Sequence, residues 1–132
     1  MVQLAKHSRT GGSVAFDLQS DGILFVRYTG PITLEFTAES ADYIIEQIEK
    51  GVRAVLYDVG ESTPEFTPVS LLDEVRRVGR AGNRMARFAY LAPENMFTKH
   101  FMLIEAAAFN DGIQVKFFSD EDEARTWLLD RV

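Results

Sequence analysis

The sequence predicts a single α/β domain in which a mainly parallel sheet, with an antiparallel edge strand, packs against helices. Two β-rich runs, residues 14–19 and 23–29, flank the turn signal Ser20-Asp21-Gly22, which is typical of an antiparallel hairpin. After the hairpin, helical periodicities alternate with short apolar runs, as they do in parallel sheets with helical crossovers. The run at residues 54–59 is apolar enough for a strand buried on both faces. The predicted order is ββαβαβαβα.

The first elements are placed by local signals. Residues 1–12 are polar and end in Thr-Gly-Gly, so we expect a flexible lead-in before a domain at residues 13–132. Gly30-Pro31 is expected to end the second strand. Thr33 is a candidate N-cap, and Gly51 a stop, for a first helix. The inward positions expected from its apolar spacing are Leu34, Ala41, Ile45 and Ile48.

The remaining elements follow the same rules. A loop at residues 60–66 leads to Thr67, a candidate N-cap followed by proline, and to a second helix that Gly79 and Gly82 close. A strand at residues 86–91 precedes a third helix that begins at Pro93. Residues 113–118 form the last predicted strand, and Ser119 or Asp120 caps the final helix.

Composition excludes several classes of function. The 132 residues suit one ordinary core, and the absence of cysteine rules out disulfides, a thiol nucleophile and thiolate metal ligands. A formal net charge of -6 argues against general nucleic-acid binding. No apolar stretch approaches the ~20 residues that span a bilayer, and the N-terminus lacks the apolar region of a signal peptide. We therefore expect a cytoplasmic protein without a transmembrane segment.

Three segments carry a family resemblance. They are Gly-Pro-Ile-Thr-Leu-Glu-Phe at residues 30–36, Val-Leu-Tyr-Asp at 55–58 and Phe-Ser-Asp-Glu-Asp-Glu-Ala-Arg-Thr-Trp-Leu at 118–128. Together with the element order, they make the chain from about residue 14 onward resemble the SpoIIAA-like proteins of the STAS superfamily. The resemblance implies a non-enzymatic binding module. The branch is also similar in topology to CRAL-TRIO lipid-transfer domains, which implies a hydrophobic pocket.

Anti-anti-sigma members of the superfamily switch when a serine is phosphorylated at the start of the helix after the central strand. The matching segment here contains Asp58, Ser62, Thr67 and Ser70, but not the usual Asp-Ser-Ser-Gly pattern. Thr67 and Ser70 lie at the helix start, where a phosphate would meet free N–H groups. Acidic residues of the same segment, Asp58 included, oppose added negative charge. The phosphorylation switch is therefore not carried over, and kinase treatment with mass analysis is its test.

Two surfaces are candidates for binding. Apolar residues after the second strand and around the third helix predict a pocket or an interface: Phe66, Met96, Phe97, His100 and Phe101. Met102 and Leu103 fall off the main apolar stripe, so the third helix is apolar on more than one side and favours a homodimer through the second and third helices. Arg76, Arg77 and Arg80 are candidate anion contacts; a solvated helix end is the alternative.

Catalysis has little support in the sequence. His100 is the only histidine within the predicted helices, where a hydrogen-bonded boundary residue is the simpler interpretation. No glycine-rich phosphate loop and no metal-ligand spacing occurs, so no cofactor or metal is expected. The first hypothesis is a non-enzymatic binding or regulatory module that acts on a protein partner as a homodimer. The alternatives are a carrier of a hydrophobic molecule or lipid and, least favoured, an esterase-like enzyme using Ser62 or Ser70 with His100.

Overall fold

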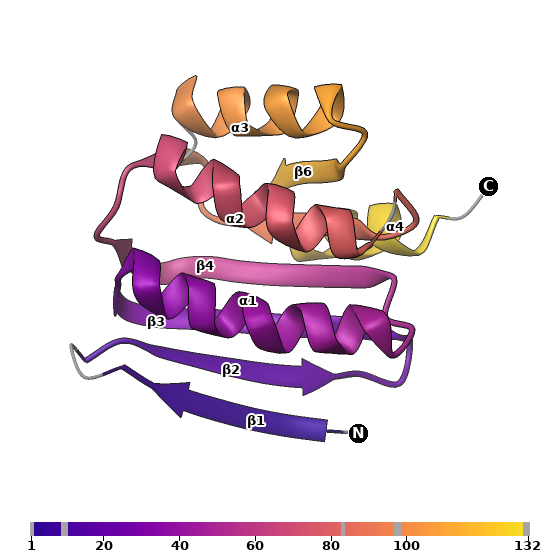
Figure 1. Cartoon of the computed structure of the whole chain (residues 1–132), viewed down its shortest axis with the longest axis horizontal. Coiled ribbons are helices and arrows are strands. Elements are labelled where there is room, and N and C mark those ends of the chain that lie inside the picture. Colours follow the sequence, from indigo (N-terminus) through magenta and orange to yellow (C-terminus); the bar gives the residue numbers. More distant parts are fainter. Residues whose placement is uncertain (1, 9–10, 83, 97–98, 131–132) are drawn as a thin grey trace.

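A six-stranded sheet forms the centre of the fold, and its strands follow one another across the sheet in chain order (Figure 1). The structure, a computed structural model, describes residues 2–8, 11–82, 84–96 and 99–130. The strands are β1 (Val2–His7), β2 (Ser13–Leu18), β3 (Ile23–Ile32), β4 (Ala54–Pro64), β5 (Arg87–Leu91) and β6 (Gln114–Phe118). The β1–β2 and β2–β3 pairs are antiparallel, and β3 to β6 are parallel. The predicted fold class is confirmed.

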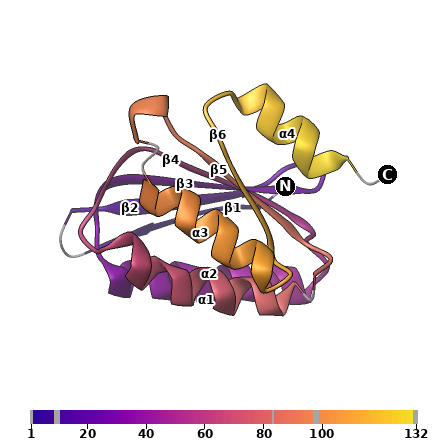
Figure 2. The ribbon, with the colours of Figure 1, turned by 90° about the horizontal axis from the view of Figure 1, so that it is seen from above.

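The helices lie on both faces of the sheet. Figure 2 shows α1 (Leu34–Glu49), α2 (Pro68–Ala81) and α3 (Lys99–Asn110) on one face and α4 (Glu121–Leu129) on the other. The larger core cluster joins the sheet to α1, α2 and α3, while a smaller cluster lies under α4. Within the described residues, no helix has the length and apolar character needed to cross a bilayer.

The starts of α1, α2 and α4 agree with the sequence prediction. Thr33 and Thr67 are the N-caps of α1 and α2, and their hydroxyls accept the N–H groups of Phe36 and Ser70, each at 3.2 Å. Asp120 caps α4 by accepting the N–H of Asp122 at 2.9 Å. These contacts span three residues or fewer, so the local sequence is sufficient to specify them.

The N-terminal prediction is wrong for residues 2–7. These residues form β1, which pairs with β2 from Val2 opposite Leu18 to His7 opposite Ser13, so β1 and not β2 lies at the edge. The connection turns tightly: the N–H of Ser8 donates to Gly12 O at 2.7 Å, and Gly11 has φ 97°. Strand pairing uses backbone groups, so a segment without clear apolar alternation can still join a sheet.

Two further boundaries differ from the prediction. β3 continues through Gly30-Pro31 to Ile32, and β4 extends to Pro64 where a loop was expected. The last β2–β3 pair is Ser13 with Thr29, so the missing N–H of Pro31 breaks no bond with β2. Beyond that point β3 still pairs with β4, up to Ile32 opposite Pro64.

The inward face of α1 and the start of the third helix also differ from the sequence prediction. In α1, Leu34 is exposed, whereas the buried residues are Phe36, Ser40, Ala41, Ile44 and Ile48. The apolar spacing from which the inward face was predicted does not include Ser40, which is polar. The third helix does not begin at Pro93; a short 3-10 turn, η1 (Glu94–Met96), precedes α3 at Lys99. Proline fits this first turn because it has no N–H to donate.

Candidate functional site

A cavity of about 90 Å³ lies between the sheet and the helices α1 and α2, partly open to solvent. Its walls are mostly apolar. Helix α1 contributes Ala41 and Ile44, and α2 contributes Leu71, Val75 and Val78. A dry cavity of about 150 Å³ admits benzene, so this space fits a smaller apolar group or one end of a longer molecule.

A row of aromatic rings crosses the strands beneath the helices. Tyr57 of β4 lies opposite Tyr90 of β5, which lies opposite Phe117 of β6. The rings stack with centroids 4.5 Å apart for the first pair and 5.0 Å for the second. Phe101 of α3 packs on Phe117 at 5.2 Å. Paired residues share one face of a sheet, so this register places both tyrosines on the cavity side.

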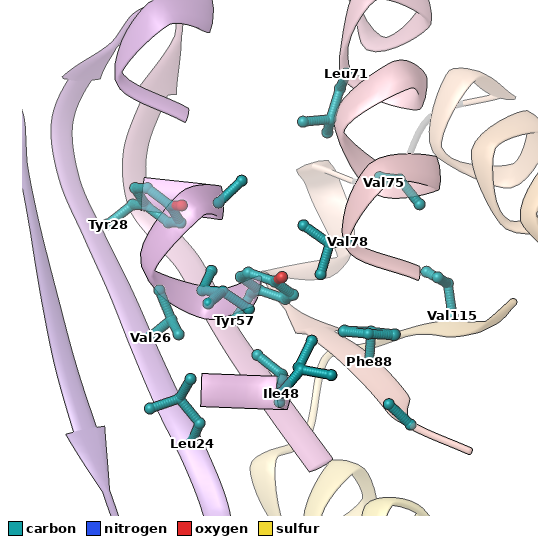
Figure 3. Packing of buried hydrophobic residues seen from close by; sticks show 14 of the residues in the cluster. Leu24, Val26, Tyr28, Ile48, Tyr57, Leu71, Val75, Val78, Phe88 and Val115 are labelled. Atoms are coloured by element: carbon teal, nitrogen blue, oxygen red, sulfur yellow. The ribbon is translucent and has the colours of Figure 1, made fainter. Parts of the chain in front are cut away.

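A bulge between β3 and β4 shapes one end of the cavity. The register shifts after Arg27, so that one β3 residue, Tyr28, faces two β4 residues, Val59 and Gly60. Tyr28 and Val59 both line the cavity. A bulge bends the strand and redirects the neighbouring side chains. Figure 3 shows the rings of Tyr28 and Tyr57 extending from the strands into the space below the helices.

The three phenols at this wall differ in their hydrogen bonding. The hydroxyl of Tyr28 lies 2.5 Å from the Oγ of Ser40, which is 1% exposed. The hydroxyls of Tyr57 and Tyr90 make no hydrogen bond with any residue that the structure describes, and neither oxygen is fully enclosed, since Asp17 Oδ1 is the one enclosed side-chain oxygen without a partner in the described chain. Tyr57 is nonetheless only 5% exposed.

Burial dominates the acidity of these phenols. Desolvation raises the pKa of Tyr28 to about 12, although its hydrogen bond with Ser40 lowers the pKa. Burial also raises the pKa of Tyr57 and of Tyr90, and the neighbouring phenols raise both further. All three hydroxyls therefore stay protonated at neutral pH and can donate a hydrogen bond.

Few other polar groups reach the cavity. Glu74 lines it, and its Oε2 accepts two hydrogen bonds from Arg77, from Nη2 at 2.8 Å and from Nε at 3.1 Å. The hydroxyl of Ser62 also lines it and donates to Val59 O at 2.7 Å. None of the described lining residues is lysine, arginine or histidine.

The predicted pocket residues are partly brought together. Phe66, Met96 and Phe101 all line the cavity. Phe97 lies outside the described residues. His100 is in the first turn of α3, and its side chain lies outside the described part of the structure.

The predicted regulatory residues do not form one group. Asp58 has its Oδ2 3.2 Å from the Nε of Arg27, while its Oδ1 accepts the N–H of Gly60 at 3.1 Å. Thr67 and Ser70 lie at the start of α2, where their hydroxyl oxygens are 2.8 Å apart. Of the four predicted residues, only Ser62 lines the cavity.

The arginines of α2 mostly contact carboxylates of the chain itself. Arg76 Nε lies 2.6 Å from Asp111 Oδ2, and Arg77 Nη1 lies 2.6 Å from Asp42 Oδ1. Arg80 is exposed at the end of the helix. Anion binding by these residues would have to compete with the existing ion pairs, so it stays a prediction. Among the described residues, no cluster of three or more His, Asp or Glu side chains could hold a metal ion.

The outer surface of α3 exposes large apolar side chains. Met102 is 70% exposed, Leu103 61% and Phe109 80%. The sequence prediction that this helix is apolar on more than one side agrees with these values. In the described part of the chain, β6 lies next to α3 and its outer edge has no partner strand.

The sequence prediction missed the tyrosines and Ser40. A signal was present, since Val55 and Tyr57, like Phe88 and Tyr90, alternate in central strands and so share a face. Tyrosine is common in strands, however, and Tyr57 and Tyr90 differ from other strand tyrosines only in the cavity that lies beside them.

Comparison with known proteins identifies related folds. The SpoIIAA-like family model matches residues 23–129. An anti-sigma factor antagonist from Mycobacterium paratuberculosis superposes with a TM-score of 0.65 at 13% identity, covering 95% of this chain and 100% of that one. The unphosphorylated anti-sigma factor antagonist SpoIIAA gives 0.61 at 14% identity, with 86% and 96% covered.

An uncharacterized protein with a SpoIIAA-like fold from Shewanella loihica gives a TM-score of 0.59 at 19% identity, with 93% of this chain and 98% of that chain covered. At such identities these structures establish the fold alone. A search of curated protein sequences found no match.

Proposed function

The chain belongs to the SpoIIAA-like family, and from that premise we propose that it is a non-enzymatic binding module whose cavity holds a small hydrophobic molecule. The observation that carries the proposal is the partly open, mostly apolar cavity between the sheet and the helices α1 and α2. Ligand sites are typically apolar hollows with few polar groups, and this cavity has that character.

The cavity is supported by residues from separate parts of the chain. Phe66 after β4, Met96 of η1 and Phe101 of α3 meet there, although they are far apart in sequence. Large apolar side chains from three elements surround the cavity, so the chain has enough apolar residues nearby to have filled it. Cavities without an occupant reduce stability, because the lining loses packing contacts.

Titration with cyclopentane, followed by amide chemical shifts, tests the proposal. We expect saturable shifts at residues lining the cavity and little change on the α4 face. An Ala41→Leu variant should abolish these shifts by filling the space, whereas Ala124→Leu, on the buried side of α4, serves as the matched control. Cyclopentane shifts that are absent, or that persist unchanged in Ala41→Leu, contradict the proposal.

We also propose a protein interaction, with a second copy of the chain as the partner. The supporting observation is the pair of exposed apolar side chains Met102 and Phe109, which line one shallow hollow with β6, whose outer edge has no partner strand among the described residues. Burying these two side chains in each copy favours association by several kcal/mol before the cost of lost translational and rotational freedom. Sedimentation should show a dimer that Phe109→Glu dissociates, while Glu123→Gln on exposed α4 leaves it intact. A monomer at high micromolar concentration rules it out.

A further inference from the structure

Two phenols at the cavity wall, the buried Tyr57 and the half-buried Tyr90, make no hydrogen bond with any residue that the structure describes. Tyr57 is 5% exposed and lines the cavity, and Tyr90 stacks beside it at 4.5 Å. No described residue accepts a hydrogen bond from either hydroxyl. The third phenol, Tyr28, is satisfied by Ser40 within the chain. Among the described residues, the only fully enclosed side-chain oxygen without a partner is Asp17 Oδ1, so the hydroxyls of Tyr57 and Tyr90 remain accessible. Both can therefore donate a hydrogen bond to a molecule that enters the cavity.

The charges around the cavity limit what that partner can be. Glu74 lines the cavity with a carboxylate, and the guanidinium of Arg77 that binds it also binds Asp42 at 2.6 Å. No described lining residue offers another positive charge. An anionic group would therefore be desolvated beside an existing carboxylate without a free cation, which is strongly unfavourable. A cationic group would meet the carboxylate of Glu74, but Arg77 already occupies that carboxylate with two hydrogen bonds, and the phenols are only weak acceptors.

We propose that the occupant of the cavity carries an uncharged hydrogen-bond acceptor, such as a ketone or ester carbonyl, which the hydroxyls of Tyr57 and Tyr90 bind. This inference rests on the proposed function of the cavity and specifies the class of ligand. The apolar part of the molecule lies against α1 and α2, and the carbonyl faces the tyrosine pair. Both hydroxyls donate, and a carbonyl oxygen has two lone pairs with which to accept them.

Three probes that share a five-membered ring distinguish an apolar, a neutral acceptor-bearing and an anionic ligand. They are cyclopentane, cyclopentanone and cyclopentanecarboxylate, each titrated at pH 7 and followed by amide chemical shifts. In the parent protein we expect the ketone to bind and the carboxylate to bind more weakly. Tyr57→Phe or Tyr90→Phe should weaken ketone binding by roughly three- to tenfold, the effect of one net hydrogen bond, and leave cyclopentane binding unchanged. Tyr43→Phe, on α1 and outside the cavity, is the matched control.

The outcomes distinguish this inference from the proposed function. If cyclopentane binds but neither variant changes the ketone dissociation constant, the inference fails and the proposed function stands. Failure of cyclopentane and cyclopentanone alike removes the proposed function, and the inference with it. A carboxylate that binds more tightly than the ketone also overturns the inference, because it requires a cation at the site.

A measurement without ligand provides an independent test. A hydroxyl that has no partner in the empty protein contributes nothing favourable to folding, so Tyr57→Phe should fold with a Tm at or above that of the parent. A clearly lower Tm would mean that the hydroxyl already has a partner within the chain, which contradicts the inference. The variant keeps the aromatic ring, so its stacking on Tyr90 is retained.

Discussion

Filling the cavity from α1 gives a prediction in which the sign of the effect is decisive. Ala41 is 3% exposed and lines the cavity, so Ala41→Leu directs three additional carbon atoms toward the empty space. Elsewhere in the core, added carbon atoms would be forced against close-packed neighbours. The change is therefore expected to stabilise the protein only if the space is real.

The size of the effect follows from the cavity volume. Residual cavities destabilise proteins by about 24 cal/mol per Å³, so a space of about 90 Å³ corresponds to about 2 kcal/mol. Burying three further carbon atoms contributes about 0.8 kcal/mol each, a similar total. Leucine will not fit the space perfectly and loses rotamer freedom, so we expect a gain of about 1 kcal/mol.

Urea denaturation followed by circular dichroism measures this gain as a higher midpoint at an unchanged slope. Ala124→Leu is the matched control, because Ala124 is a fully buried helical alanine that does not line the cavity. Overpacking there should cost about 1–3 kcal/mol. If Ala41→Leu destabilises the protein as much as Ala124→Leu does, no space is available beside Ala41 and the cavity does not exist in solution.

Three further predictions concern the polar groups of the fold. Ser40→Ala should cost about 1–3 kcal/mol in urea denaturation, because it leaves the buried hydroxyl of Tyr28 without a partner; adding Tyr28→Phe should recover most of the loss, and no recovery would contradict this assignment. Thr67→Ala should cost about 1 kcal/mol through loss of the α2 N-cap, while Thr67→Asp should retain the stability; equal losses would show that capping is not the cause. Stability should fall as pH rises from about 10 to about 12, since Tyr28 has a folded pKa of about 12 and the unfolded chain releases this proton first, at an ordinary pKa near 10. The loss from Tyr28 is about 1.4 kcal/mol per pH unit. When the free energy of unfolding from urea denaturation is plotted against pH, the parent should therefore fall more steeply than Tyr28→Phe between about pH 10 and pH 12, and the two should run parallel below that range.

The sequence predicted the features that neighbouring residues determine. Thr33 and Thr67 cap helices through contacts within three residues, and the turn before β3 and the central strand at Ala54 depend on equally local patterns. The edge strand β1 was missed because its partners are the backbone groups of β2, which impose no side-chain pattern. The sequence predicts a break at Pro31 because it does not show that the pairing with β2 ends before this residue.

The apolar residues of the candidate site could be predicted from the sequence, but the presence of a cavity between them could not. Phe66, Met96 and Phe101 could be identified from residue type and helical spacing. Whether a gap remains between them depends on how far α1 and α2 lie above the strands, which is a property of the whole packing. The same distance decides whether Tyr57 is an ordinary core residue or one wall of a cavity.

Hydrogen bonds and ion pairs offer a physical reason for the distance between the sheet and the helices α1 and α2. The bond between Tyr28 of β3 and Ser40 fixes α1 above the sheet, since both groups are almost fully buried and lose their partner if the helix moves. Arg77 joins α2 to α1 through Asp42 and through the carbonyl of Ala38 at 3.0 Å, so the two helices are held relative to each other. Apolar contacts alone would favour closing the gap, because they gain from any approach. Hydrogen bonds favour one separation, and they can therefore maintain a space that is completed only when a second molecule enters it.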